Sequence, residues 1–183
     1  MDLKQAYKIL SWHNTSRDKP PGESVGLFIP LPENLSKQFP PDGKAQEDTS
    51  PCHVTLYYIG ELENSKQQDM IGVVRSVAKI TKPFQVSLAP SNFFVNKKNQ
   101  KIIHSPVIGE DLQKLHYVVQ GAFKFLELPF LDKYPEYKPH VTIEYVNEGE
   151  QEKYGNLSPR GEWLVDHFWI WGTEKPEVIR LEG

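Results

Sequence analysis

The sequence predicts an α+β fold with mostly antiparallel sheets, divided between two related lobes. Short segments rich in β-branched and aromatic residues alternate with turns, and 15 prolines and 12 glycines in 183 residues favour many short elements over long helices. Two longer segments instead repeat their apolar residues at helical spacing. These two helices separate two similar strand-containing halves, which is the element order of an α+β protein.

Eight segments have the composition of strands. Val25 to Ile29 is an apolar run that stops at Pro30, and Cys52 to Ile59 is a β-branched and aromatic run that stops at Gly60. The other strands are predicted at Phe84 to Leu88, Phe93 to Val95, Lys101 to His104, His140 to Val146, Trp163 to Trp171 and Val178 to Leu181.

Two helices are predicted from apolar periodicity. The first lies within residues 64–80, and Pro83 blocks its extension. The second runs from Leu112 to Leu126. Glu110 and Asp111 at its start suit the helix dipole, and Pro129 closes it.

We expect one domain over residues 1–183, with an N-terminal extension at 1–23 and lobes at roughly 24–90 and 91–183. Residues 40–51 carry nearly no apolar side chains, so they are expected to form an exposed loop directly upstream of a histidine-bearing strand. A second loop, Leu131 to Pro139, precedes another such strand.

The composition excludes several classes of protein. Lys and Arg number 21 against 24 Asp and Glu, for a net charge of −3, so a protein that coats duplex DNA is not expected. The single cysteine, Cys52, excludes an internal disulfide framework and a cysteine-based zinc site. No apolar run approaches the roughly 20 residues that span a bilayer. Residues 1–5 lack the layout of a signal peptide, so we expect a soluble cytoplasmic protein with no membrane partner.

The main functional signal is a repeated motif. Residues 51–56 (Pro-Cys-His-Val-Thr-Leu) and 138–143 (Lys-Pro-His-Val-Thr-Ile) are close copies, each in a predicted strand that follows a proline-bearing loop. Side chains at positions i and i+2 of a strand point to the same face. His53 should therefore lie beside Thr55, and His140 beside Thr142. Two such strands facing each other would place two imidazoles and two hydroxyls around one cleft.

These four groups suit the cleavage of a phosphodiester. A neutral imidazole can take a proton from the attacking oxygen while a protonated one gives a proton to the leaving oxygen. Histidine has an ordinary pKa of about 6.5, so both forms exist near neutral pH. The threonine hydroxyls can donate to the non-bridging phosphate oxygens. The scheme needs no metal and no other cofactor, and it leaves open which histidine is the acid.

The repetition distinguishes this site from histidines that merely pack in a sheet. Far fewer than one His-x-Thr pair is expected by chance from six histidines and six threonines, yet the chain has three. The third, at residues 13–15, lacks strand flanks and is interpreted as coincidence. A lone copy would be interpreted as a hydrogen-bonded histidine of a sheet edge, whereas two copies in matching contexts indicate a shared site.

The two motifs resemble those of the 2H phosphoesterases, which include the RNA-ligase-like LigT proteins and cyclic phosphodiesterases. The resemblance covers most of the chain from Val25 onward, and extends to Gly60 after the first motif and Pro139 before the second. It implies a bilobal fold with pseudo-twofold symmetry, helices outside and a central cleft. It also implies metal-independent catalysis, with the two motif histidines as acid and base and the two motif threonines binding the phosphate.

The substrates that this resemblance implies are small nucleotides or RNA ends: 2′,3′-cyclic phosphates, 2′–5′ linkages or cyclic oligonucleotide signals. The strand from Val25 to Pro32 followed by residues 38–40 (Gln-Phe-Pro) is also similar to phage-type members of the family. That similarity implies a viral enzyme, active in the host cytoplasm, that degrades cyclic-nucleotide immune messengers.

Four further residues are candidates for substrate binding. Tyr57 and Glu144 lie at position i+4 from the motif histidines, nominally on the same strand face. A carboxylate there could orient an imidazole or a ribose hydroxyl. Trp171 and Phe39 could stack on a nucleobase, although such aromatic side chains also pack in cores.

Two rival functions remain at this stage. A catalytically idle nucleotide- or RNA-binding module could share the fold, although the intact His-Thr pairs speak against it. A virion-associated structural protein would show no phosphodiesterase turnover. The sequence does not indicate the oligomeric state.

Overall fold

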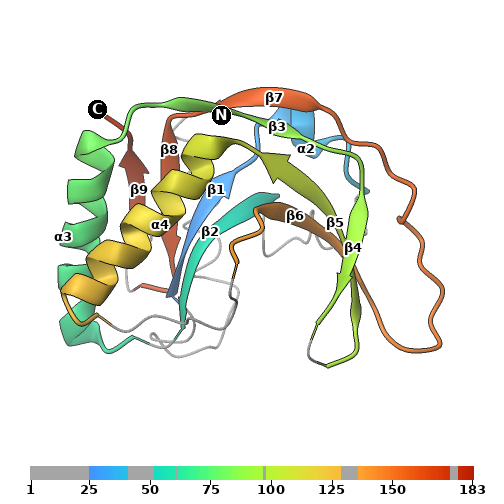
Figure 1. The fold of residues 1–183 in the computed structure, drawn as a ribbon, viewed down its shortest axis with the longest axis horizontal. Helices are drawn as coiled ribbons and strands as arrows, with labels where there is room; N and C mark the ends of the chain where they lie inside the picture. Colours follow the sequence, from blue (N-terminus) through green and yellow to red (C-terminus); the bar gives the residue numbers. More distant parts are fainter. Residues whose placement is uncertain (1–24, 41–51, 61, 97, 129–135, 174–176) are drawn as a thin grey trace.

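The computed structural model describes residues 25–40, 52–60, 62–96, 98–128, 136–173 and 177–183 (Figure 1). The predicted extension 1–23, most of the loop 40–51 and part of the loop 131–139 lie outside these residues. The elements are β1 (Val25–Pro30), α2 (Glu33–Ser36), β2 (His53–Gly60), α3 (Asn64–Ile80), β3 (Phe84–Leu88), β4 (Asn92–Val95), β5 (Lys101–Ile108), α4 (Glu110–Phe125), β6 (His140–Val146), β7 (Gly161–Val165), β8 (His167–Trp171) and β9 (Glu177–Arg180).

The fold consists of two antiparallel sheets and helices, which confirms the α+β prediction. The first sheet has the strand order β2-β1-β8-β9. In the second sheet the order is β4-β5-β3-β7, and β6 pairs with β5. β3 and β4 follow one another along one edge of β5, since Leu88 pairs with Val107 and Asn92 with His104, which leaves the other edge to β6.

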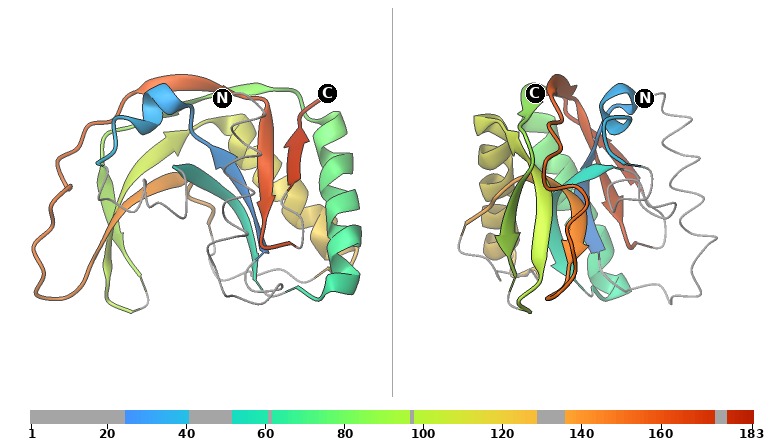
Figure 2. Two further views of the ribbon diagram at one scale, coloured as in Figure 1. Left: turned by 180° about the vertical axis from the view of Figure 1, so that it is seen from behind. Right: turned by 90° about the vertical axis from the view of Figure 1, so that its right-hand side faces the viewer.

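The helices form where the sequence periodicity places them. The buried residues of α4, at positions 112, 115, 119 and 123, make one apolar stripe. This helix lies over β2 and β3, and α3 lies beside α4 and β9 at one end of the molecule (Figures 1 and 2). One continuous apolar core joins both sheets to both helices. Within the described residues, no helix has the length and apolar character needed to cross a bilayer.

The sheets do not follow the predicted division of the chain at residue 90. β3 belongs to the second sheet although it precedes residue 90, and β8 and β9 return to the first sheet from the end of the chain. The central strand β1 is buried along its whole length, and it needs a partner on each side: β2 supplies one and β8 the other. Hydrophobic patterning reports that a strand is buried but not which strand pairs with it.

Two predicted strands differ from the observed ones. The segment from Trp163 to Trp171 is split at Asp166 into β7 and β8, which join different sheets. The strand predicted to end at His104 continues to Ile108 through Pro106, which has no N–H to donate. The carbonyl of Pro106 still accepts a hydrogen bond from the Ala89 amide at 2.9 Å, so the proline is accommodated in the strand.

Candidate functional site

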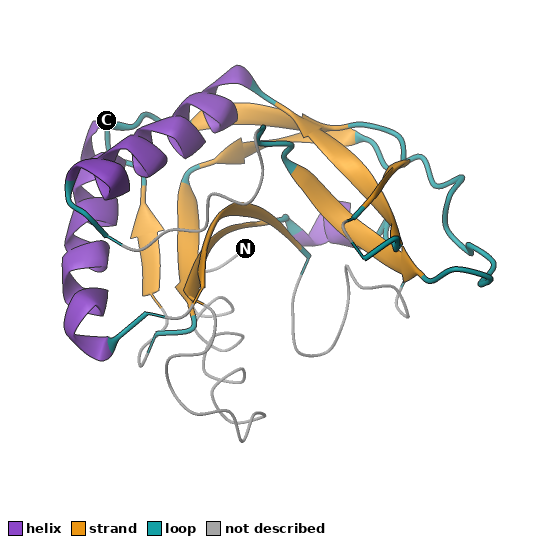
Figure 3. Cartoon of the chain, turned by 60° about the horizontal axis from the view of Figure 1, so that its bottom comes forward, coloured by secondary structure: helices purple, strands orange, loops and turns teal. Residues whose placement is uncertain are grey.

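The two His-x-Thr motifs lie on strands that meet at the centre of the molecule. β2 is an edge strand of the first sheet, and β6 borders β5 in the second. The two strands contact one another without belonging to one sheet. Figure 1 labels both strands, and Figure 3 shows the strands of the two sheets in orange from another side. Each begins with the histidine of its motif, His53 in β2 and His140 in β6. The fold therefore brings together two segments that are 87 positions apart in the sequence.

A β-bulge follows the threonine of the first motif. Phe28 of β1 pairs with Thr55, but its neighbour Leu27 pairs with Tyr57, so Leu56 is the extra residue. Such a bulge shifts the alternation of side chains along the rest of the strand.

The second motif contains the same irregularity at the same position. His104 of β5 pairs with Thr142, but its neighbour Ile103 pairs with Glu144, which makes Ile143 the extra residue. The two motifs thus share the sequence His-Val-Thr, the strand position and the bulge. This repetition is the pseudo-twofold relation expected of the two lobes.

His53 lies among aromatic rings. Its imidazole packs edge-to-face against Phe28 at 4.9 Å between ring centroids, and against Trp171 at 5.1 Å. Gly26 makes room for this arrangement, because a Cβ at that position would lie 2.5 Å from the ring of Phe28. The predicted site residue Trp171 is therefore a neighbour of the first motif.

His140 lies beside a further imidazole. The rings of His140 and His104 are 5.1 Å apart, and Phe94 contacts both, at 5.3 and 4.8 Å. His104 occupies the place that Phe28 has in the other half, since each is the register partner of the motif threonine. No motif surrounds His104 in the sequence, so it was not among the predicted site residues.

Burial sets the protonation of these two histidines. It lowers the pKa of His140, and it is also the main cause that lowers the pKa of His104, with smaller contributions from His140 and Lys138. The carbonyl of Lys138 lies 2.6 Å from Nδ1 of His140, and a carbonyl can only accept, so Nδ1 carries the hydrogen. The neutral ring of His140 therefore has its lone pair on Nε2.

The bulges decide which side chains accompany the motifs. Tyr57 was expected on the face of His53, but the structure places it in the core, where its ring contacts His116 and Phe123 of α4. Glu144 pairs across the strands with the buried Ile103 and so does not lie on the face of the imidazoles. Both residues follow the extra residue of a bulge, so the i+4 rule fails for them.

Two tyrosines take the places that Tyr57 and Glu144 were expected to fill. Tyr58 and Trp171 both pair with Gly26, so they lie in one row of paired residues across the first sheet. Tyr145 and Phe94 likewise lie in one row of paired residues across the second sheet. Their side chains are 42% and 41% exposed. The signal for them is present in the sequence, because both copies read His-Val-Thr-(Leu/Ile)-x-Tyr, with the tyrosine five positions after the histidine.

Phe39, the other predicted stacking residue, is only 2% exposed and belongs to the main core. An aromatic ring that is packed in the core offers no free face to a nucleobase. The structure therefore does not bring Phe39 together with the two motifs.

Glu144 organises the loop after β6. Its carboxylate accepts hydrogen bonds from the amides of Lys153 at 3.0 Å and Tyr154 at 3.2 Å. Bonds from amides to a carboxylate are stronger than those to a neutral acceptor.

Replacing Glu144 with alanine is therefore expected to loosen this loop. The amides of Lys153 and Tyr154 should exchange with solvent roughly tenfold faster, since about 1.4 kcal/mol corresponds to that factor. Hydrogen exchange followed by NMR measures the change, with the amide of Phe123 in the core of α4 as the internal control. Unchanged protection of both loop amides would contradict this role for Glu144.

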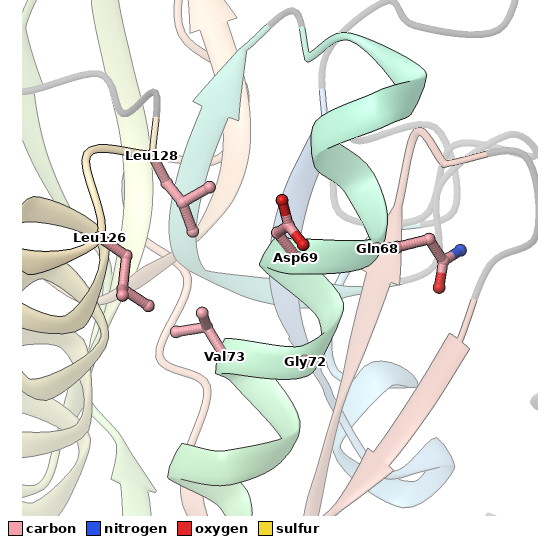
Figure 4. A pocket seen from close by; sticks show the side chains of 6 residues that line it. All are labelled: Gln68, Asp69, Gly72, Val73, Leu126 and Leu128. Atoms are coloured by element: carbon pink, nitrogen blue, oxygen red, sulfur yellow. The ribbon is translucent and has the colours of Figure 1, made fainter.

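Two further features of the described residues are a buried cysteine and a hollow beside α3. Among the described residues, no cluster of three or more His, Cys, Asp or Glu side chains has the arrangement of a metal site. Cys52 is buried, which raises the pKa of its thiol to about 11. A hollow of about 360 Å³ lies between α3 and the end of α4 (Figure 4), lined by Gln68, Asp69, Gly72, Val73, Leu126 and Leu128. None of these residues belongs to the two motifs.

The chain is similar to proteins of known family and fold. The family model of the 2′-5′ RNA ligase superfamily matches residues 41–177. No curated protein matches the sequence. Among solved structures, the protein TT0787 of Thermus thermophilus has a TM-score of 0.68 and 19% identity, covering 87% of this chain and 98% of that chain.

Two other similar structures contain nucleotides. E. coli LigT complexed with 3′-AMP has a TM-score of 0.61 and 15% identity, covering 87% of this chain and 95% of LigT. Usb1 of Kluyveromyces marxianus with uridine monophosphate has a TM-score of 0.58 and 11% identity, covering 88% and 99%. At these identities the likeness shows the bilobal fold, which confirms the fold prediction. The family model spans most of the chain and both motifs, so this protein belongs to the 2′-5′ RNA ligase superfamily of 2H phosphoesterases.

Proposed function

We propose that this protein is a metal-independent phosphodiesterase that cleaves a phosphodiester of a small nucleotide or of an RNA end. The observation that carries the proposal is the meeting of two His-x-Thr strands with the same bulge, one from each sheet. Two imidazoles and two hydroxyls are the groups that acid–base cleavage of a phosphodiester requires.

His140 is the general base in this scheme. Its Nδ1–H is held by the Lys138 carbonyl, so Nε2 can accept the proton of the attacking water or ribose hydroxyl. Burial lowers its pKa and thereby keeps it neutral at physiological pH. The attacking oxygen bonds to phosphorus as it loses this proton.

His53 is the general acid. It gives a proton to the leaving oxygen as the bond between that oxygen and phosphorus breaks. This assignment follows from that of His140 as the base, and the rings of Phe28 and Trp171 pack against the imidazole that gives the proton. After one turnover His140 is protonated and His53 is neutral, and exchange with solvent restores both.

The hydroxyls of Thr55 and Thr142 donate to the non-bridging oxygens of the phosphate. Both side chains are half-buried, and each lies one position from a core valine that fixes its strand. Negative charge grows on these oxygens in the transition state, which is where a fixed donor contributes most.

The nucleobase binds against aromatic side chains of the same face. Trp171 lies beside His53, and the exposed Tyr58 and Tyr145 share rows with Trp171 and Phe94. Base–aromatic stacking tolerates different bases. A nucleotide substrate is also in keeping with the nucleotides held by E. coli LigT, which include ATP and NADP+.

The acid limb of the pH profile of kcat/KM is expected below the ordinary histidine pKa of about 6.5. The lowered pKa keeps His140 neutral, and able to accept a proton, to a lower pH than an exposed histidine. Activity falls only as the pH drops through that lowered pKa and the ring becomes protonated. Initial rates measured from about pH 4.5 to about pH 9 give the profile. An acid limb centred above pH 6.5 would contradict the assignment of His140 as the base.

A substrate panel in excess EDTA tests the proposed function. It contains 2′,3′-cyclic nucleotides, 2′–5′-linked dinucleotides, cyclic di- and trinucleotides and 3′–5′ dinucleotides, with the His53→Ala/His140→Ala double variant as the blank. We expect turnover of at least one of the first three classes. The phage-type similarity stays a prediction, and turnover of a cyclic oligonucleotide in preference to the other classes would support it. Activity that EDTA abolishes would sink the metal-free scheme, and no turnover above the blank would favour a non-catalytic binding module.

A further inference from the structure

Two side chains from outside β2 bind its backbone at the bulge. The hydroxyl of Tyr137 donates to the carbonyl of Thr55 at 3.0 Å. Nδ1 of His116, on α4, lies 2.8 Å from the carbonyl of Leu56 and donates its hydrogen to that oxygen. The bulge leaves Leu56 out of the regular strand ladder, and β2 is an edge strand, so the carbonyls of Thr55 and Leu56 can take partners from outside the sheet. Tyr137 and His116 supply them.

The ring of Tyr137 is held by the ring of His116. The two rings are stacked, with centroids 3.9 Å apart and planes within 2° of parallel. Burial raises the pKa of Tyr137, so its hydroxyl remains a donor at any pH where the protein works. The contact is therefore fixed in geometry and in protonation.

Tyr137 also precedes the second motif directly. The next residue is Lys138, whose carbonyl accepts the hydrogen bond that orients the imidazole of His140. Tyr137 thus anchors one peptide segment to the first motif, and the same segment orients the histidine of the second motif. One short path, from the Thr55 carbonyl through Tyr137 and Lys138, connects both halves of the site.

We propose that Tyr137 is a positioning residue that fixes the separation of the two motifs, and that His116 holds Tyr137 in place by stacking. The proposal rests on the proposed function, because the geometry it protects is that of Thr55 and His140 around a phosphate. Misplacing a reacting group by about 1 Å can cost a factor of about one hundred in rate, which is why a hydrogen bond remote from the phosphate can matter.

Tyr137→Phe tests the proposal, since phenylalanine keeps the stacked ring and removes the hydroxyl. We expect kcat to fall roughly ten- to a hundredfold with little change in KM. The second readout is the imidazole NMR spectrum of His140, which should show the Nδ1–H form in the wild type and a mixture of tautomers in the variant. Tyr117→Phe is the matched control: the ring of this tyrosine also contacts His116, but Tyr117 lies on α4 and is 46% exposed, so its variant should behave as the wild type.

Two variants of His116 separate stacking from hydrogen bonding. His116→Phe keeps an aromatic ring against Tyr137 and should lose only a few-fold in kcat, whereas His116→Ala should lose about as much as Tyr137→Phe. A Tyr137→Phe protein that keeps both the wild-type kcat and the wild-type His140 spectrum overturns the proposal. A Tyr137→Phe protein whose only change is a lower free energy of unfolding also overturns it. If the wild type turns over no substrate, the proposed function fails, while the NMR comparison still decides whether Tyr137 positions His140.

Discussion

Replacing His140 with alanine is expected to lower kcat/KM by about 10²–10⁴-fold, and His53→Ala by a similar factor. Each substitution removes one of the two proton transfers, from the attacking oxygen in the first case and to the leaving oxygen in the second. The losses should not add in the double variant, because the two transfers belong to one transition state. Rates with a cyclic nucleotide or dinucleotide substrate measure the effect.

A substrate with a good leaving group distinguishes the two histidines. A nitrophenyl phosphodiester of a nucleotide releases an anion that needs no proton, so its cleavage depends on the base alone. We expect His53→Ala to approach the wild-type rate on this substrate, while His140→Ala stays inactive. The reverse pattern would exchange the two roles.

His167→Ala is the control for both variants. This histidine begins β8, four positions before Trp171, and its Nδ1 bonds the carboxylate of Asp166 at 2.5 Å. Its loss should leave kcat/KM within about twofold of the wild type. If His53→Ala or His140→Ala is as active as the wild type, the histidine that was replaced has no part in the mechanism.

Thr55→Val and Thr142→Val are each expected to lower kcat by about 10²–10³-fold, which is the typical cost of losing one donor to a developing oxyanion. Valine has nearly the same shape as threonine, so the substitution removes the hydroxyl and little else. Both positions are half-buried, and the fold should tolerate the change. The loss should appear mainly in kcat, because the hydroxyl acts most strongly on the transition state.

Serine variants and a remote threonine provide the controls. Thr55→Ser and Thr142→Ser keep the donor and should retain most of the activity. Thr81, at the end of α3, donates its hydroxyl to the Val77 carbonyl at 2.7 Å. Thr81→Val should lower the free energy of unfolding by about 1 kcal/mol without changing kcat. A Thr→Val motif variant with the wild-type kcat would remove that hydroxyl from the phosphate site.

The strands, helices and motifs were predictable because each depends on a local pattern of residues along the chain. The alternation within His-Val-Thr sets the histidine and threonine of each copy on one face, and the valine between them is buried in both. Apolar spacing in residues 64–80 and 112–126 similarly predicted α3 and α4. The strand face predicted for Tyr57 and Glu144 was wrong, because the bulges at Leu56 and Ile143 depend on how β2 pairs with β1 and how β6 pairs with β5.

The sequence by itself determined the fold class, the repeated motif and the four groups of the proposed chemistry. Tertiary structure alone decided which residues surround those groups: His104 and Phe94 beside His140, Phe28 and Trp171 beside His53. It also placed Tyr137 between the two motifs. The physical reason is that side-chain direction along a strand follows from local backbone geometry, whereas strand pairing, bulges and the meeting of two sheets are set by the packing of the whole core.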